Sequence, residues 1–596
     1  MASSKAFEHH YREAMRRLCF ALIAGALLIP SSAGAAPSSR VENDDDAEAI
    51  FLAHPKVERW MQRYSRETWR TSSIFRAQRN VWEIGIYSGR AGQTAAGEID
   101  RQGRVVKVLV GPQVAWPLAR GGGIGGAINR PLIWLSFCLL FAIGLADVRR
   151  PLSMRNLDVL ALLSFSIHLW FFNEGRVFAS AIAAVATLVY LIARAVWMGW
   201  TNRASPAPSR LPVWLLVGAT VLLLGFRAGL TIEQEGVLDV GYAGVIGADR
   251  LADGTSPYGR FPLRDTGRPC GPRNTDGEIA DWIQSNQRCE TANPLGDTYG
   301  PVNYHAYLPG LAVFGWSGKW DRLPAVRFTT LLFDLLALLG LAAVGYRFGG
   351  QHLGALLAFA WAANPFTQYV SSSNANDAIM PAFLIWGFWA ESSHLGRGAF
   401  AALASWTKLA ALVVVPLWAT YPAREWRRTA VFVGAFLATT ALSFWMLFAG
   451  GDPIEELRRF YERTFEIQFD RRSPFSLWDW GQYHAEGIPD LRWGQRVLQV
   501  VVAVAALALA FFPRRKSPFQ LAALTGALLM GFQLALTHWS ALYIAWFFPF
   551  VALAVLAGAE LGGVVPERSR FGLPARQPRR QAPSAGLSSP QAAPID

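Results

Sequence analysis

Three aspartates lie in one polar stretch, GVLDVGYAGVIGADRLADGTSPYG, which follows a long apolar run. They are Asp239, Asp249 and Asp253. A carboxylate held against a hydroxyl group can remove its proton, which contributes roughly 10²–10⁴-fold to a reaction rate. Alternatively, the carboxylates form the solvated end of a helix, and Arg250 favours local ion pairs there. The stretch therefore holds either a general base or a helix terminus.

Polar residues also interrupt or follow later apolar segments. Asp297 precedes a segment rich in aromatic residues that contains His305, and Asn376 and Asp377 follow another apolar run. Each is a candidate for binding an acceptor molecule or a metal ion. The alternatives are a turn residue for Asp297, a packed surface histidine for His305, and a helix cap for Asn376 and Asp377.

The elements that position these residues are membrane helices. The chain has 596 residues, of which 52% are hydrophobic and 17% are charged. Its net charge is +13, but the arginines lie mainly in short loops, which is typical of membrane orientation rather than of nucleic-acid binding. The apolar runs are 131–147, 156–172, 178–193, 211–230, 325–346, 352–370, 377–391, 397–421, 429–449, 496–512, 517–536 and 540–558.

The arginine distribution predicts the topology, because cytoplasmic loops are enriched in positive charge. The loops expected inside are 149–155, 194–210, 424–428, 513–516 and 568–580. This requires residues 301–316 to lie along the outer surface and residues 397–421 to form two short helices meeting near Lys408. A lysine in the middle of one spanning helix costs roughly 2.5–3.5 kcal/mol, so the break is favoured. We therefore expect a mainly α-helical protein with about thirteen spans and outer loops at 231–324 and 450–495.

The N-terminal region precedes these helices. Residues 1–35 resemble a signal peptide, the alternative being an uncleaved first helix. In residues 41–118 we expect a helix over 54–69, a strand at VWEIGIY, and a strand–turn–strand within GEIDRQGRVVKVLVG. The pattern EID-x-x-G-x-V resembles PepSY-like domains, which implies a binding or regulatory module; a simple packing module is the alternative. The remaining segments are a Gly-rich linker (119–130), additional membrane helices (131–210), a membrane core (211–560) and a disordered basic cytoplasmic tail (561–596).

The chain has four cysteines. Cys270 and Cys289 share the outer loop 231–324, so we expect a disulfide between them if that loop is extracytoplasmic. No Cys/His spacing predicts a structural zinc site.

Several motifs in the core, taken in order, resemble superfamily C glycosyltransferases of the bacterial α-mannosyltransferase-like group. After Asp239 comes G-x-x-PY, and the later segments are DTYGPVNYHAYLPGLAVFG, AANPFTQYVSSSNAND, SWTKLAALVVVP and RTFEIQFDRRSPFSLW. The resemblance covers about residues 211–560. It implies a multi-pass enzyme that takes a sugar, such as mannose or arabinose, from a polyprenyl-phosphate carrier at the outer face of the cell membrane. The acceptor would be a lipid, a glycan or a protein.

The same resemblance implies Asp239 as the catalytic base. The leaving lipid phosphate needs positive charge, which Lys408, Arg471, Arg472 or a divalent metal ion could supply. Arginine grips phosphate in bidentate fashion, whereas lysine acts as a point charge. Alternatively, Lys408 reaches a water pocket and the arginines anchor the chain at the lipid interface.

Two other classes of function fit a polytopic chain. One is a transporter or flippase for lipid-linked glycans, which needs a polar path through the bilayer. The charges expected within the bilayer are few, namely Asp158, Asp334 and Lys408, and no inverted repeat is evident. The other is a non-catalytic membrane scaffold. No Gly-Lys-Ser/Thr phosphate loop is present, which fits a lipid-linked donor rather than a nucleotide.

Overall fold

The computed structural model describes residues 41–564 except for a number of short gaps. These gaps are 78–79, 89–91, 115–126, 174–176, 206–210, 234–236, 260–262, 265–280, 284–288, 292–296, 317–322, 449–450, 467, 469–475 and 479–490. The expected signal peptide, most of the Gly-rich linker and nearly all of the C-terminal tail lie outside the described residues. So do Arg471, Arg472, Cys270 and the side chain of Cys289, and the disulfide therefore stays a prediction.

The N-terminal region folds around its own apolar core. Its elements are α2 (Asp44–Leu52), α3 (Pro55–Met61), β1 (Trp69–Arg76), β2 (Val81–Ser88), β3 (Gly92–Asp100) and β4 (Val105–Val110). The strands pair as an antiparallel sheet in chain order. Phe51, Trp60 and Ile86 belong to one cluster of buried side chains between the helices and the sheet. The predicted strands and the turn between β3 and β4 are confirmed. The predicted helix over 54–69 is wrong, because the helix ends at Met61 and Trp69 begins a strand.

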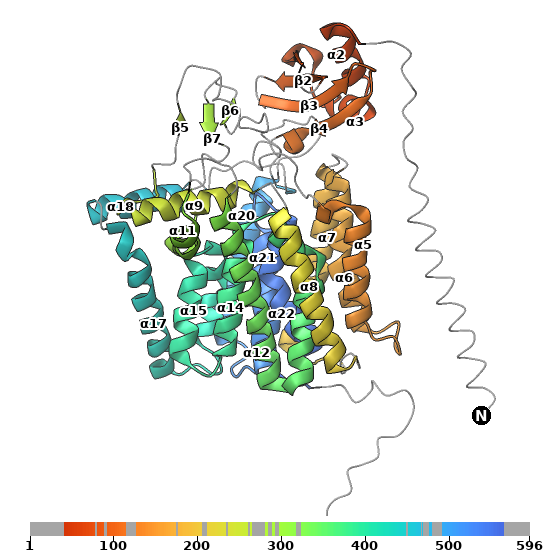
Figure 1. The fold of residues 1–596 in the computed structure, drawn as a ribbon. Helices are drawn as coiled ribbons and strands as arrows, with labels where there is room; N and C mark the ends of the chain where they lie inside the picture. The colour runs from red at the N-terminus through yellow and green to blue at the C-terminus, as the bar shows by residue number, and fades with distance from the viewer. Residues whose placement is uncertain are drawn as a thin grey trace, which may run out of the picture.

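The rest of the chain is a bundle of apolar helices (Figure 1). They are α5 (Pro131–Leu145), α6 (Met154–Asn173), α7 (Val177–Thr201), α8 (Val213–Glu233), α12 (Pro324–Ala363), α14 (Ile379–Trp389), α15 (His394–Ser405), α16 (Val415–Ala419), α17 (Trp426–Phe444), α20 (Arg492–Phe511), α21 (Pro518–Leu534) and α22 (Ile544–Leu556). Among the described residues, five helices are long and apolar enough to cross a membrane: 179–201, 213–233, 324–363, 426–448 and 492–511. The protein is therefore mainly helical with several candidate spans, and the total of about thirteen stays a prediction.

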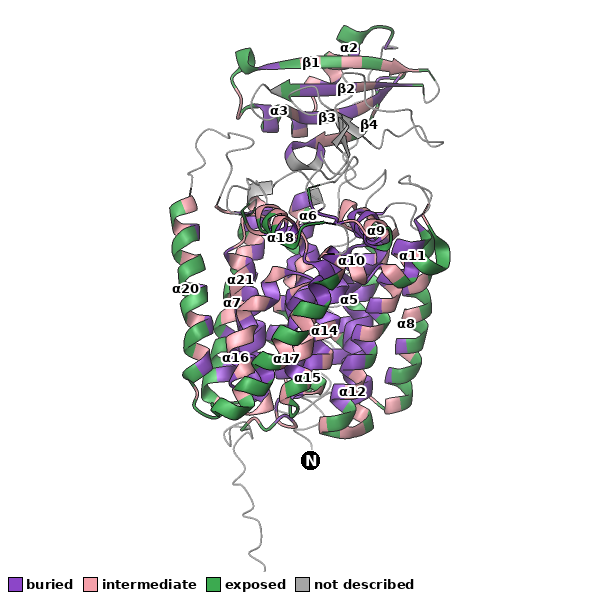
Figure 2. Cartoon of the chain, turned by 90° about the vertical axis from the view of Figure 1, so that its left-hand side faces the viewer, coloured by how far each residue is buried: buried purple, intermediate pink, exposed green. Residues whose placement is uncertain are grey.

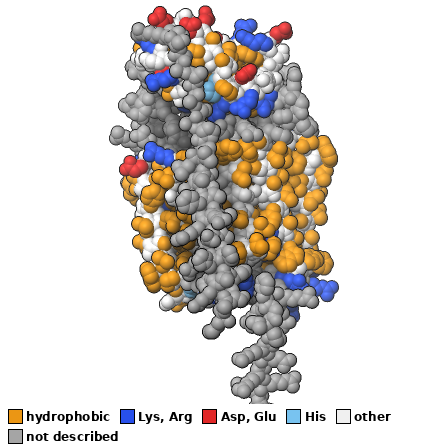
Figure 3. All heavy atoms as spheres, turned by 90° about the vertical axis from the view of Figure 1, so that its right-hand side faces the viewer, with side chains coloured by type: hydrophobic (Ala, Val, Ile, Leu, Met, Phe, Trp, Pro, Cys, Tyr) orange, Lys and Arg blue, Asp and Glu red, His pale blue; other side chains and the backbone are white. Residues whose placement is uncertain are grey.

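The outer surface of the bundle is apolar. α20 turns a largely exposed face outward (Figure 2), and only 17% of its most apolar stretch is buried. Figure 3 shows a broad band of hydrophobic side chains across the middle of one face of the bundle, with Lys and Arg side chains near its borders. A hydrocarbon environment matches such a surface, since exposed apolar patches of this extent are rare in soluble monomers.

Different loops meet at the two ends of the bundle. At one end the basic loops meet, since the Lys516 amide donates to the Pro422 carbonyl and Ala423 pairs with Arg515. At the other end the Leu238 amide donates to the Ser373 carbonyl, and the Val302 amide to the Trp406 carbonyl. The N-terminal domain lies beyond this second end (Figure 1). We call it the polar-loop end.

Three short helices lie at the polar-loop end rather than crossing the bundle. They are α9 (Asp239–Ala252), α11 (Leu308–Phe314) and α18 (Pro453–Tyr461), with α10 (Pro301–His305) just before α11. The expectation that residues 301–316 do not cross is confirmed. Part of the loop 231–324 also forms a small sheet of β5 (Leu263–Arg264), β6 (Asp281–Ile283) and β7 (Cys289–Thr291), which the sequence did not predict.

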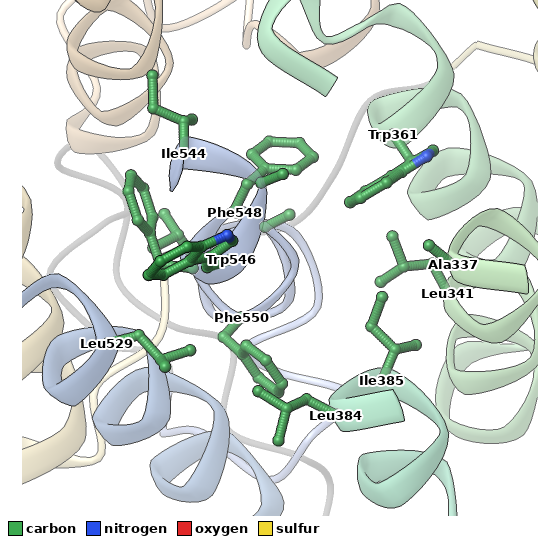
Figure 4. Close-up of a cluster of buried hydrophobic side chains, with 14 of the residues drawn as sticks. Ala337, Leu341, Trp361, Leu384, Ile385, Leu529, Ile544, Trp546, Phe548 and Phe550 are labelled. Carbon is green, nitrogen blue, oxygen red and sulfur yellow. The ribbon is translucent and has the colours of Figure 1, made fainter. Parts of the chain in front are cut away.

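The centre of the bundle is α22, in which every residue is buried. Figure 4 shows its Trp546, Phe548 and Phe550 packed among side chains of α12, α14 and α21. A helix that is apolar on all sides must be surrounded by other helices, as this one is. The indole N–H of Trp546 is the polar exception, and a buried indole requires an acceptor.

Candidate active site

Asp239 is the first residue of α9, and its side chain is partly buried. Its Oδ1 accepts the amide N–H of Val240 at 2.9 Å. A carboxylate at a helix N-terminus is stabilised by the unsatisfied amides and the helix dipole. The base candidate therefore lies at the polar-loop end, at the start of a helix that lies along this end of the bundle (Figure 1).

Glycines at every third residue allow α9 to approach its neighbours closely. A Cβ on Gly241 would lie 2.3 Å from the carbonyl oxygen of Asn374, and one on Gly244 would lie 2.2 Å from the ring of Tyr307. A Cβ on Gly247 would come within 2.1 Å of Tyr304. This glycine stripe fixes the position of Asp239, and its spacing is a sequence signal that our sequence reasoning missed.

Substituting Gly241 by Ala is therefore expected to displace the start of α9 and lower the turnover number at least about tenfold. The clash is with a backbone atom, which cannot rotate away, and a misplacement of about 1 Å can cost roughly 10²-fold. Gly229→Ala in α8 is the matched control, because no heavy atom lies within 4 Å of the added Cβ. Full activity of the Gly241→Ala variant would contradict this role of the stripe.

Asp377 and Lys408 form a buried ion pair beside this helix. Lys408 Nζ lies 2.6 Å from Asp377 Oδ1, and the two side chains are 7% and 2% exposed. The Trp546 indole donates to the same carboxylate oxygen at 2.9 Å. Buried charges are tolerated when they are paired and hydrogen-bonded, as both are here.

Lys408 lies at a break between helices. α15 ends at Ser405, and Lys408 is extended (φ −141°, ψ 127°) before a 3₁₀ turn (Leu409–Val414) begins. Three aromatic rings surround the ammonium group: Tyr299 at 5.3 Å, Tyr543 at 5.6 Å and Trp546 at 5.0 Å. These distances suit cation–π attraction. The expected break at Lys408 is confirmed.

The start of α9 adjoins the segment that leads to Asp377, because the Leu238 amide donates to the Ser373 carbonyl. Asp239 is near enough there to contribute to the electrostatic surroundings of Lys408, although burial and Asp377 contribute more. A carboxylate at the start of α9 and a cation held by Asp377 thus belong to one site at the polar-loop end. The helix-cap interpretation of Asp377 does not fit. The short 3₁₀ turn Asn376–Ala378 and α14 have no side-chain cap, and the Asp377 carboxylate bonds to Lys408 and Trp546 instead.

Asp297 serves a different purpose in the structure. Its two oxygens accept from Arg463 at 2.7 and 2.5 Å, and Oδ2 also accepts the Gly259 amide at 2.8 Å. The side chain is fully buried. Asp297 therefore joins the PYG turn after α9 to the π-helical turn Glu462–Glu466, which follows α18. Arg463 was not a sequence candidate.

His305 is the last residue of α10, and Asn376 directly precedes Asp377. Asn376 donates from Nδ2 to Asn303 Oδ1 at 2.9 Å. Burial lowers the pKa of His305, which favours its neutral imidazole. Within the described ranges, no three His, Cys, Asp or Glu side chains gather as metal ligands.

Asp249 and Asp253 lie at the far end of α9. Asp249 is in its last turn, and Asp253 is the residue that caps it. At 1.5 Å per residue, Asp249 is about 15 Å from Asp239 along the helix. This placement matches the interpretation of Asp249 and Asp253 as the solvated end of a helix.

Two other buried charges within the bundle are paired. Asp158 accepts from Arg194 at 3.1 Å and from the hydroxyl of Tyr190 at 2.9 Å. Asp334 accepts from Arg227 and from the indole of Trp361. In each pair the carboxylate is bound by nearby side chains of the same cluster, so neither pair resembles part of a continuous polar path through the bundle.

The family model for Glycosyltransferase family 87 matches residues 304–537. This match is consistent with a glycosyltransferase of the superfamily C type. The matched range includes Asn376, Asp377 and Lys408 but begins after Asp239 and Asp297. No curated protein matches the chain significantly.

Proposed function

We propose that this protein is a membrane glycosyltransferase that moves a sugar from a polyprenyl-phosphate donor to an acceptor hydroxyl on the extracytoplasmic side. The acceptor belongs to a lipid, a glycan or a protein, and mannose and arabinose are the sugars to test first. One observation carries the proposal: Asp239 at the start of α9 and the buried Lys408–Asp377 pair lie on adjoining segments at the polar-loop end of an apolar bundle, because the Leu238 amide donates to the Ser373 carbonyl shortly before Asp377. The family match over 304–537 supports it.

In the proposed reaction, Asp239 removes the proton from the acceptor hydroxyl as its oxygen attacks the anomeric carbon. The bond from that carbon to the phosphate oxygen breaks, and its electron pair leaves with the lipid phosphate. Attack opposite to the leaving group inverts the anomeric configuration. Lys408 supplies positive charge near the departing phosphate, and a cation aimed at developing charge is worth most where water is excluded. Arg471 and Arg472 remain candidates for the same phosphate.

The orientation of the bundle gives a separate prediction. The basic loops should lie in the cytoplasm and the polar-loop end outside, because positive residues accumulate on the cytoplasmic side. In a chain whose native cysteines are replaced by serine, Asp253→Cys should react with an impermeant maleimide in intact cells. Arg427→Cys should react only after permeabilisation. Both positions are exposed in the structure. Labelling of Arg427→Cys in intact cells would reverse the assignment.

Transfer by the purified chain tests the function. In detergent solution, the protein should move radiolabelled sugar from decaprenyl-phosphate mannose or decaprenyl-phosphate arabinose to a membrane-extract acceptor. A flippase needs two membrane faces and therefore produces nothing in detergent. Absence of transfer from both donors, together with movement of either lipid across liposome bilayers, would replace this proposal by the transporter alternative.

A further inference from the structure

Two buried asparagines at the polar-loop end leave a donor and an acceptor unused. Asn376 Nδ2 donates to Asn303 Oδ1 at 2.9 Å. The other atom of each amide, Asn303 Nδ2 and Asn376 Oδ1, has no hydrogen-bond partner among the described residues. The two side chains are 0% and 1% exposed. Thus the contact between α10 and the turn Asn376–Ala378 leaves the NH2 group of Asn303 and the side-chain carbonyl oxygen of Asn376 without partners among the described residues.

This contact lies next to the candidate active site. Asn376 directly precedes Asp377, which holds Lys408. Tyr307, four residues after Asn303, packs on Gly244 of α9 and is near enough for the charge of Asp377 to raise its pKa, although burial is the larger cause. The Tyr307 hydroxyl also has no partner in the part of the chain that the structure describes.

Leaving such groups unpaired destabilises a folded protein. An unsatisfied buried donor or acceptor costs about 1–3 kcal/mol, and native structures contain few of them. A neighbouring N–H and C=O are complementary to a hydroxyl group, which accepts one hydrogen bond and donates another. A sugar carries several such hydroxyls.

We propose that Asn303 and Asn376 together bind one hydroxyl group of a sugar, either the donor's or the acceptor's, with the Tyr307 hydroxyl beside it. The inference rests on the proposed glycosyl transfer and adds a specificity site to it. Asn303 Nδ2 donates to the sugar oxygen, and that hydroxyl donates to Asn376 Oδ1. Both atoms are enclosed, so a neighbouring side chain must rotate before the sugar enters.

Asn303→Asp is the sharpest variant for testing this site. It keeps the Oδ1 that accepts from Asn376 and removes the unpaired donor, but it also adds a negative charge. Asn303→Leu removes the donor without adding a charge, so a loss common to both variants reports the hydrogen bond rather than electrostatics. Thr330→Val is the matched control, since it removes another buried polar atom without a partner, on α12.

The measurement is the dissociation constant of the purified full-length chain for three kinds of probe. These are decaprenyl phosphate, the decaprenyl-phosphate forms of mannose, arabinose, glucose and galactose, and the octyl glycosides of the same sugars. Both Asn303 variants should weaken binding of the preferred sugar at least about tenfold, as expected for one lost hydrogen bond. Binding of decaprenyl phosphate should change by less than about twofold, and Thr330→Val should leave all probes unchanged. A loss confined to the lipid-linked sugars assigns the hydroxyl to the donor, and a loss for the octyl glycosides assigns it to the acceptor.

Several outcomes would overturn the inference. One is equal sugar binding by wild-type and both Asn303 variants, and another is an equal loss for decaprenyl phosphate and the sugar probes. The inference is also overturned if the wild-type chain binds decaprenyl phosphate as tightly as every lipid-linked sugar and binds none of the octyl glycosides. A wild-type chain that binds none of the probes and transfers no sugar instead contradicts the proposed function itself.

Discussion

Replacing Asp239 by Asn is expected to lower the turnover number by about 10²-fold or more, while the affinity for the lipid-linked donor changes little. Asparagine has nearly the same size and retains an oxygen that can accept the Val240 amide, so the start of α9 should keep its structure. Only the basicity of the carboxylate is lost. Single-turnover rates and donor binding, measured on the same preparation, separate the two effects.

Asp249→Asn and Asp253→Asn are the controls for this variant, because they remove the same charge from the other end of the same helix. Both should keep most of the activity. Asp297→Asn needs a stability measurement beside the rate, since it weakens the contacts to Arg463 and Gly259. If Asp239→Asn turns over normally while a stable Asp249→Asn or Asp297→Asn variant is inactive, another carboxylate is the base.

Much of the bundle could be predicted from the sequence, because burial in a membrane imposes strong rules on composition. The predicted run 325–346 matches the first arm of α12, which is broken where Gly350 adopts a positive φ of 72°. The run 352–370 was predicted too long, because the second arm ends at Ala363 and a separate helix, α13 (Pro365–Ser372), follows. The break at Lys408 followed from the energy of placing a charge in hydrocarbon. The N-terminal helix was predicted too long. The strand β1 is set by its pairing with β2, which local periodicity does not reveal.

The candidate site was predictable only in part. Motif order and predicted topology pointed to Asp239 and Lys408. The contacts that hold the site together, however, join residues that are far apart in the sequence. Asp377 and Trp546 are 169 residues apart, and Asp297 and Arg463 are 166 residues apart. A buried carboxylate requires a partner, yet the sequence does not say which one, because packing of several helices brings the two together.

The ion pair of Asp377 and Lys408 gives the second large expected effect. Lys408→Met leaves the Asp377 carboxylate buried without its cation, and Asp377→Asn leaves the Lys408 ammonium without its anion. Each single substitution should lower the free energy of unfolding by about 3–5 kcal/mol, because an unpaired buried charge is much less favourable than a pair. Each should also abolish most of the sugar transfer. Thermal unfolding in detergent and the transfer assay measure these two quantities separately.

The double variant Lys408→Met/Asp377→Asn distinguishes a structural from a catalytic role. It removes both charges and keeps an amide oxygen for the Trp546 indole, so most of the stability should return. Transfer should not return, because the cation that we propose to face the leaving phosphate is still missing.

The pair of Arg194 and Asp158 is the matched control, since it is equally buried and lies on α6 and α7, away from this site. Arg194→Met/Asp158→Asn keeps an acceptor for the Tyr190 hydroxyl and should retain both stability and transfer. If the Lys408→Met/Asp377→Asn chain regains stability and transfers sugar at the wild-type rate, Lys408 only holds the fold together. The positive charge at the phosphate must then come from elsewhere, and Arg471 and Arg472 would be the next residues to substitute.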